Sequence, residues 1–162
     1  MDKIDKLLDL IKKDKRCEVN PPKGDLSSLP NNKLKCPEDV IYFYQKCNGV
    51  KLFCNDNSLI TFTILPNDEV LNSNMKIVGE LCEYDISSTW YLIAKTDNND
   101  YLSIDLSLER NGRCYDSNYE VHGVVGSSTV IALSFSELLS ELYNTGGKDI
   151  YWKKKNYGDA YD

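Results

Sequence analysis

Two helix patterns, separated by a long stretch of strand-like sequence, constrain the fold of this chain more than any other feature. The first pattern lies within residues 36–53. Pro37 stands where a helix begins, a position at which proline loses no hydrogen bond, and Asn48-Gly49 supplies a left-handed stop. The sequence therefore predicts a helix from Pro37 to about Asn48, with an apolar face made of Val40, Ile41, Tyr44 and Cys47.

The second pattern predicts a helix over residues 135–143. Ser134 and Glu137 have the spacing of a capping box, in which both side chains accept hydrogen bonds from free backbone N–H groups. Leu133 and Leu138 have the spacing of a hydrophobic staple. The stripe expected to face the core consists of Phe135, Leu138, Leu139 and Leu142.

Between these helices the apolar residues alternate with a period of two, which indicates strands because successive side chains of a strand point to opposite faces. Consecutive strands joined by short turns form antiparallel pairs, and the flanking helices must cover one face. The sequence thus predicts an α+β fold, with a mostly antiparallel sheet flanked by an N-terminal helix pair and a C-terminal helix. Trp90, which alternates with Leu92 and Ala94, is expected in the core or at its edge. The expected elements are strands at 50–54, 59–65, 90–95, 101–106 and 113–119, a short helix at 67–71 and a short strand around 122–125.

The 162 residues are expected to form one domain. Residues 1–35 would form an N-terminal helix (2–15) and a loop, residues 36–145 the core, and residues 146–162 a tail. Charged residues interrupt the first helix, and no apolar run reaches the roughly 18 residues of a membrane span. We therefore expect a cytoplasmic protein that does not interact with a membrane.

Cysteine usage agrees with a reducing compartment. The six cysteines include no CxxC pair, and a chain in which 41% of residues are hydrophobic builds a core without disulfides. The single histidine, His122, has no neighbour at the spacing of a zinc site. The sequence thus predicts no bound metal and six free thiols, which are Cys17, Cys36, Cys47, Cys54, Cys82 and Cys114.

Charge is divided unevenly along the chain. Residues 1–35 carry nine Lys or Arg and six Asp or Glu, whereas residues 36–162 carry ten and nineteen. Residues 36–162 thus form an acidic body, which repels the phosphate backbones of nucleic acids. Nucleic acid is therefore a poor candidate for a partner, and a basic protein is a better one. The alternative is that the acidic excess only keeps the protein in solution.

Four motifs within residues 36–142 carry a resemblance to a known family. They are Pro37 with Tyr42-Phe43-Tyr44 and Asn48-Gly49, then Trp90 at the start of a strand, then Ile104-Asp105 in a strand, then Ile131-Ala132 with Ser134-Phe135 and Leu138-Leu139. Their order and spacing are similar to those of the SUKH superfamily. That superfamily includes yeast regulators of cell-wall synthesis and many bacterial toxin-immunity proteins.

The resemblance implies a single domain with a curved sheet, without a cofactor and without catalytic residues. Bacterial members commonly bind and neutralise a cognate toxin, so the resemblance implies an immunity protein whose partner is a toxin domain. The acidic body suggests that this domain is basic. The alternative within the same class is a regulatory adaptor of the fungal kind. The oligomeric state and the identity of the toxin stay open.

An enzyme is the alternative from a different class. Cys114, Asp116 and His122 are residue types that serve as nucleophile, orienting acid and base, but no glycine-rich elbow or oxyanion-forming signature accompanies them. The loop 97–100 carries the carboxylate and amide oxygens of a calcium loop. However, Leu102 stands where an EF-hand needs glycine, so we expect a solvated hairpin turn.

The polar side of the strand at 101–106 is the best candidate for a binding site. If Leu102, Ile104 and Leu106 face the core, the residues between them point outward. Tyrosines supply large, stiff contact areas, and acidic groups steer a cationic partner. The alternative is that one face of an antiparallel sheet simply contacts water. The predicted binding residues are Tyr101, Ser103, Asp105, Tyr115, Asp116, Tyr119 and Glu120.

Overall fold

The computed structural model describes all 162 residues and contains four α-helices, one seven-stranded sheet and three short 3₁₀ helices. The α-helices are α1 (Asp2–Lys13), α2 (Glu38–Lys46), α3 (Ser73–Ile77) and α4 (Phe135–Asn144). The strands are β1 (Glu18–Val19), β2 (Val50–Leu52), β3 (Phe62–Ile64), β4 (Trp90–Thr96), β5 (Tyr101–Asp105), β6 (Cys114–Ser117) and β7 (Val130–Ala132). The 3₁₀ helices are η1 (Asn67–Glu69), η2 (Ile86–Thr89) and η3 (Tyr151–Lys153).

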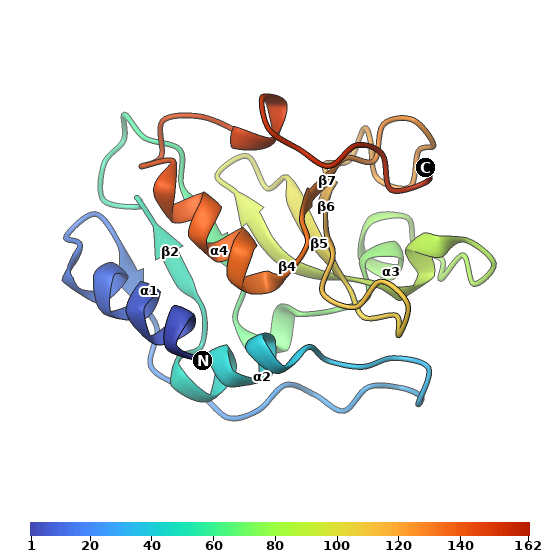
Figure 1. Ribbon diagram of the computed structural model, residues 1–162, viewed down its shortest axis with the longest axis horizontal. Coiled ribbons are helices and arrows are strands. Elements are labelled where there is room, and N and C mark those ends of the chain that lie inside the picture. Colours follow the sequence, from blue (N-terminus) through green and yellow to red (C-terminus); the bar gives the residue numbers. More distant parts are fainter.

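The seven strands pair in the order of the sequence, and every pair is antiparallel. Short turns explain this meander, because a tight connection leads a strand back beside its predecessor. Helices α1 and α2 contact α4, and all three lie on the same side of the sheet (Figure 1). The predicted single-domain α+β fold, with an N-terminal helix pair and a C-terminal helix, is confirmed.

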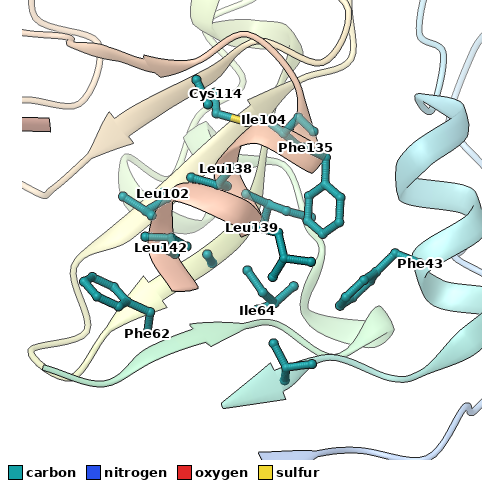
Figure 2. Packing of buried hydrophobic residues seen from close by; sticks show 14 of the residues in the cluster. Phe43, Phe62, Ile64, Leu102, Ile104, Cys114, Phe135, Leu138, Leu139 and Leu142 are labelled. Atoms are coloured by element: carbon teal, nitrogen blue, oxygen red, sulfur yellow. The ribbon is translucent and has the colours of Figure 1, made fainter. Parts of the chain in front are cut away.

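The main core lies between these three helices and one face of the sheet. Figure 2 shows Leu138, Leu139 and Leu142 of α4 close to Leu102 and Ile64 of the strands, in the same buried cluster. The predicted stripe of α4 is completely buried, as are Ile4 and Ile11 of α1. Burial of a large aliphatic or aromatic side chain contributes about 1.5–3 kcal/mol, so this layer holds the helices on the sheet.

The buried face of α2 differs from the predicted one by one residue. Ile41 is 43% exposed, whereas Phe43 is fully buried and packs edge-on against Phe135 of α4. Val40, Phe43, Tyr44 and Cys47 follow the i, i+3, i+4, i+7 spacing, and a helix turning 100° per residue carries Ile41 away from that line.

The chain leaves α2 through a glycine that no other residue can replace without strain. Gly49 has φ +92°, and a Cβ atom at this position would lie 2.4 Å from the carbonyl oxygen of Ile64. The left-handed stop predicted at Asn48-Gly49 is therefore present, with Gly49 as the left-handed residue. Close approach of the backbones lets β2 pair with β3 directly after the helix.

The predicted cap of α4 is present in a modified form. The hydroxyl of Ser134 accepts a hydrogen bond from the N–H of Glu137 at 3.1 Å, and the carboxylate of Glu137 accepts from the N–H of Leu133 at 3.0 Å. The glutamate thus reaches one residue beyond the position expected for a capping box. Leu133 itself is 48% exposed, so the hydrophobic staple is not closed by burial of that side chain.

Several short elements differ from the sequence-based expectations. Strands β1 and β7 were not predicted, because two or three residues are too few to show a period. Residues 122–125, expected as a strand, form turns instead. The short helix expected at 67–71 is the 3₁₀ helix η1, and α3 follows it.

The second face of the sheet carries its own cover and a smaller core. Helix α3, η2, the turns after β6 and residues 156–162 lie over the strands β4–β7, with the C-terminus on the side opposite α1 in Figure 1. Trp90, Tyr115, Val130 and Ala160 form this second cluster. Trp90 is fully buried as predicted, but a bulge between Leu92 and Ala94 places Ala94 in the main core instead. No helix combines the length and hydrophobicity that crossing a membrane requires.

Candidate partner-binding surface

The polar strand face predicted for binding is not a free surface. Ser103, Asp105 and Tyr115 point away from the main core, as the alternation predicts, but all three are fully buried. The cover over the second face of the sheet encloses them. The prediction that they contact a partner directly is therefore wrong, because a fully buried side chain cannot touch another protein.

Asp105 is buried, and its carboxylate accepts hydrogen bonds from four donors. Its Oδ1 accepts from the hydroxyl of Thr89 at 2.7 Å and from the N–H of Ser107 at 2.9 Å. Its Oδ2 accepts from the hydroxyl of Tyr115 at 2.5 Å and from Arg110 Nε at 3.2 Å. A buried carboxylate is tolerated only when it is paired and hydrogen-bonded, so Asp105 fastens η2, β6 and the β5–β6 connection together.

A buried chain of hydrogen bonds runs across the same face and passes through Ser103. The hydroxyl of Ser103 lies 2.7 Å from that of Ser73 in α3 and 2.5 Å from that of Ser117 in β6. Ser117 lies 2.9 Å from His122 Nδ1, and His122 Nε2 lies 2.6 Å from Asn74 Oδ1. These contacts join α3, two strands and the turns after β6 into one unit.

Asn74 fixes the direction of these hydrogen bonds. Its amide nitrogen donates to the carbonyl of Leu81 and to the hydroxyl of Ser87, so its oxygen must accept from His122 Nε2. His122 therefore carries its proton on Nε2 and accepts at Nδ1 from Ser117. Burial lowers the pKa of His122 to about 4, against the opposing attraction of Asp85. The imidazole is thus neutral near pH 7.

The chain of hydrogen bonds ends at a carboxylate that also anchors the C-terminal segment. Ser87 and the hydroxyl of Tyr161 both donate to Asp85 Oδ2, Tyr161 at 2.7 Å. Burial raises the pKa of Asp85, but these hydrogen bonds outweigh it, and the pKa lies below its ordinary value. Asp85 is therefore a charged acceptor whose hydrogen bonds link the loop after α3 to the C-terminal residues.

The other predicted binding residues do not form one surface. Tyr101 is half-buried on the second face of the sheet, where it pairs with Lys95. Asp116 lies on the core side of the sheet edge and accepts from the indole of Trp152 at 3.2 Å, and burial is the main cause of its raised pKa. Tyr119 is 82% exposed, and Glu120 beside it is exposed as well. Only these two project fully into solvent.

The residues of the enzyme hypothesis lie on different sides of the sheet. Cys114 belongs to the main core, and burial raises the pKa of its thiol well above the ordinary value. His122 packs edge-on against Trp90 in the second cluster. The structure therefore does not bring this nucleophile and this base together. All six cysteines are free, and no three His, Cys, Asp or Glu side chains converge at metal-binding distance.

The part of the second face that remains open lies over β2, β3 and the end of β4. Lys51, Thr63 and Lys95 are cross-strand neighbours there. They line a shallow depression of about 560 Å³, together with Glu69 and Asp97. This depression has charges of both signs and one hydrophobic lining residue, so it shows no electrostatic preference for a partner.

A second candidate surface is formed by three loop segments, residues 78–85, 119–126 and 156–162, which we call the acidic loop surface. They carry six Asp or Glu residues and no Lys or Arg. Tyr84 is 97% exposed and Tyr119 82%, the two highest values among the large hydrophobic residues. The acidic residues are Glu80, Glu83, Asp85, Glu120, Asp159 and Asp162, and the exposed apolar ones include Val78, Leu81, Val124, Val125 and Tyr157.

Several contacts hold the three segments together. Asp159 accepts from the N–H groups of Gly126 at 2.8 Å and Ser128 at 3.0 Å, which ties the C-terminal residues to the turns after β6. Tyr161 ties the same residues to Asp85 in the first segment. A Cβ atom on Gly123 would lie 3.9 Å from both the hydroxyl of Tyr161 and that of Ser87. The three segments therefore form one continuous region.

Of the residues on this candidate surface, the sequence patterns pointed to Tyr119 and Glu120 but not to Glu80, Glu83 and Tyr84. These residues lie in a loop without any periodicity, so no strand or helix pattern draws attention to them. A usable signal was present in the composition, because no Lys or Arg occurs between Lys76 and Lys95. A local charge profile would have found this segment.

Comparisons with known proteins agree with the resemblance given above. The model of the SMI1 / KNR4 family (SUKH-1) matches residues 31–141. A curated protein named "Immunity protein YokJ", from Bacillus subtilis (strain 168), is 40% identical over 164 residues, which cover 98% of this chain and 96% of that protein. No solved structure matches the chain. From the family match and the near full-length identity, the chain belongs to the SMI1 / KNR4 family (SUKH-1).

Proposed function

We propose that this chain is an immunity protein that binds a toxin and neutralises it by forming a complex, without catalysing a reaction. The observation that carries the proposal is 40% identity, over 98% of the chain, to a protein named as an immunity protein. The similarity covers the helices, the sheet and the loops alike, so it concerns the whole domain. A regulatory adaptor of the fungal kind has no comparable support.

Binding is favoured over catalysis by the state of the polar side chains. The polar residues of the second face are engaged with one another, and buried side-chain nitrogen or oxygen atoms without a partner occur only at Trp90 and Thr96. Groups that hydrogen-bond to each other stabilise the fold and are not free to act on a substrate. The separation of Cys114 from His122 supports the same proposal.

We place the protein in the cytoplasm. Six free cysteines, two of them in the core, suit a compartment in which thiols stay reduced. An immunity protein in that compartment would meet a toxin that acts inside the cell. The basic character proposed for the toxin follows from the net charge of −6 on this chain.

Co-expression tests the proposal. The toxin candidate encoded beside this gene is expressed in a sensitive host with and without this chain, and survival and co-purification are measured. We expect survival only with this chain, and a complex that elutes together from a sizing column. Killing that continues at full expression of this chain, with no complex for any neighbouring gene product, would contradict the proposal.

A further inference from the structure

We propose that the acidic loop surface is the docking site for a cationic face of the toxin, with Tyr84 and Tyr119 as its main contact residues. This inference rests on the proposed function and adds the place and the chemistry of binding. Neither the family match nor the named relative assigns a binding surface. The exposure, the charge and the anchoring of these loops support this docking site.

The exposure of apolar and aromatic side chains is concentrated on this surface. Tyr84, Tyr119 and Val125 are 97%, 82% and 72% exposed, which makes them the three most exposed large hydrophobic residues of the chain. Contiguous exposed apolar residues mark interaction sites in proteins that are otherwise well packed. Tyrosine is enriched among the residues that dominate binding energies, because it buries a large area with little loss of conformational entropy.

The hydroxyl groups of these tyrosines are also free. Seven other tyrosine hydroxyls donate hydrogen bonds inside the fold, for example Tyr44 to the carbonyl of Leu65 and Tyr151 to that of Ile131. Tyr84 and Tyr119 make no such hydrogen bond within the chain. Their hydroxyl groups therefore do not stabilise the fold. A contact with another protein explains why these side chains are exposed.

The charge of the surface selects the chemistry of the partner. Glu80, Glu83 and Glu120 are exposed, and their carboxylates accept no hydrogen bond and form no ion pair within the chain. The carboxylates of Asp85 and Asp159, in contrast, accept hydrogen bonds from donors within the fold. No Lys or Arg lies in the three segments. Several like charges without local counter-charges produce a field that attracts a basic face and repels nucleic acid.

Anchoring gives the loops a fixed shape. The exposed tyrosine and glutamate side chains belong to segments whose positions are fixed by hydrogen bonds. These hydrogen bonds are made by Asp85, Asp159 and His122. Trp90 stacks on Tyr115 at 3.9 Å beneath them. A surface that is ordered before binding loses less conformational entropy in the complex, which raises affinity.

Two double variants and two matched controls test the proposal on the purified toxin domain encoded beside this gene, used in a catalytically inactive form. Glu80→Lys/Glu83→Lys removes the negative field, and Asp68→Lys/Glu69→Lys makes the same change in charge beside the open depression. Tyr84→Ala/Tyr119→Ala removes the contact residues. Leu10→Ala/Leu108→Ala truncates two other exposed side chains, 54% and 62% exposed.

We expect Glu80→Lys/Glu83→Lys to slow association about tenfold or more at low salt, with a smaller effect at high salt. We expect Tyr84→Ala/Tyr119→Ala to weaken the complex about thirtyfold or more. Both controls should bind like the wild type. If the loop variants bind normally while Asp68→Lys/Glu69→Lys loses affinity, the depression is the docking site and the inference is overturned.

The outcome separates this inference from the proposed function. If the wild type binds no neighbouring toxin, the proposed function fails, and a second probe still tests the surface. A lysine decapeptide is titrated into ¹⁵N-labelled protein, and the amide shifts of residues 78–85, 119–126 and 156–162 should be the largest. Shifts concentrated elsewhere would overturn the inference, as would self-association through these loops on a sizing column, which would make a second copy the occupant.

Discussion

His122 Nε2 lies 2.6 Å from Asn74 Oδ1, although the two residues are 48 positions apart. This contact joins the turns after β6 to α3, and through Asn74 it reaches the carbonyl of Leu81 in the next loop. Two of the three segments of the acidic loop surface are thus held by one neutral imidazole. The protonation state of His122 therefore matters for the shape of that surface.

Stability is expected to fall between pH 7 and pH 5 because of His122. Its pKa is about 4 in the fold, below the value near 6.5 of an unfolded chain, so the unfolded state binds the proton more readily. The free energy of unfolding should fall by roughly 2 kcal/mol between pH 7 and pH 5 from this group. Urea unfolding at both pH values measures the difference.

His122→Gln provides the control, because glutamine does not titrate. In this variant the fall in stability between the two pH values should be smaller by most of that amount. An equally large fall in the variant would show that other groups cause the pH dependence. The lowered pKa of Asp85 adds a loss only at lower pH, where that carboxylate takes up a proton.

Asp105→Ala should destabilise the fold without weakening binding by the folded protein. The substitution removes the buried carboxylate partner of Arg110 and the acceptor of Thr89, Ser107 and Tyr115. We expect a loss of about 3 kcal/mol in the free energy of unfolding. Denaturation and toxin affinity are measured on the same preparation, and a loss of affinity at full folding would restore Asp105 as a contact residue.

Gly49→Ala should be far more costly than Gly24→Ala. Both glycines have positive φ, +92° and +98°, but only at Gly49 would the new Cβ meet a backbone oxygen. We expect Gly24→Ala to cost about 1 kcal/mol and Gly49→Ala at least about 3 kcal/mol. Similar melting temperatures for the two variants would show that the backbone of β3 can move away from a Cβ atom at position 49.

Ser134→Ala should remove the cap of α4. The hydroxyl of Ser134 is the acceptor for the N–H of Glu137, and alanine offers none. The expected loss is about 0.5–2 kcal/mol in the free energy of unfolding, and Ser134→Asp, which keeps an acceptor oxygen, should restore most of it. An unchanged stability in Ser134→Ala would mean that water replaces the cap.

The sequence predicted the elements that depend on a long repeated pattern. Helices α1, α2 and α4 and strands β4 and β5 lie close to the predicted ranges, because their apolar residues repeat over several turns or alternations. The elements of two or three residues, β1 and β7, were missed for the opposite reason. The division into residues 1–35, 36–145 and 146–162 stays a prediction.

The candidate site was harder to predict, because the strand pattern does not show which segments cover the sheet. Alternation correctly places Ser103 and Asp105 on the face opposite the main core, but it says nothing about whether loops cover that face. Here Ser73, Asn74 and His122 come from segments far away in the chain and fold over it. A polar residue in a strand therefore indicates which side of the sheet it lies on. Only its burial shows whether it belongs to an internal hydrogen-bond network or to the protein surface.

Titration of toxin activity with the purified protein tests the central claim most directly, because a blocking partner is consumed and a catalyst is not. Toxin activity is measured against the molar ratio of the two proteins after a short and a long incubation. Neutralisation by complex formation predicts a linear loss that ends at about one equivalent and is the same at both times. Full inactivation by a small fraction of an equivalent, growing with time, would contradict the account and point to an enzyme.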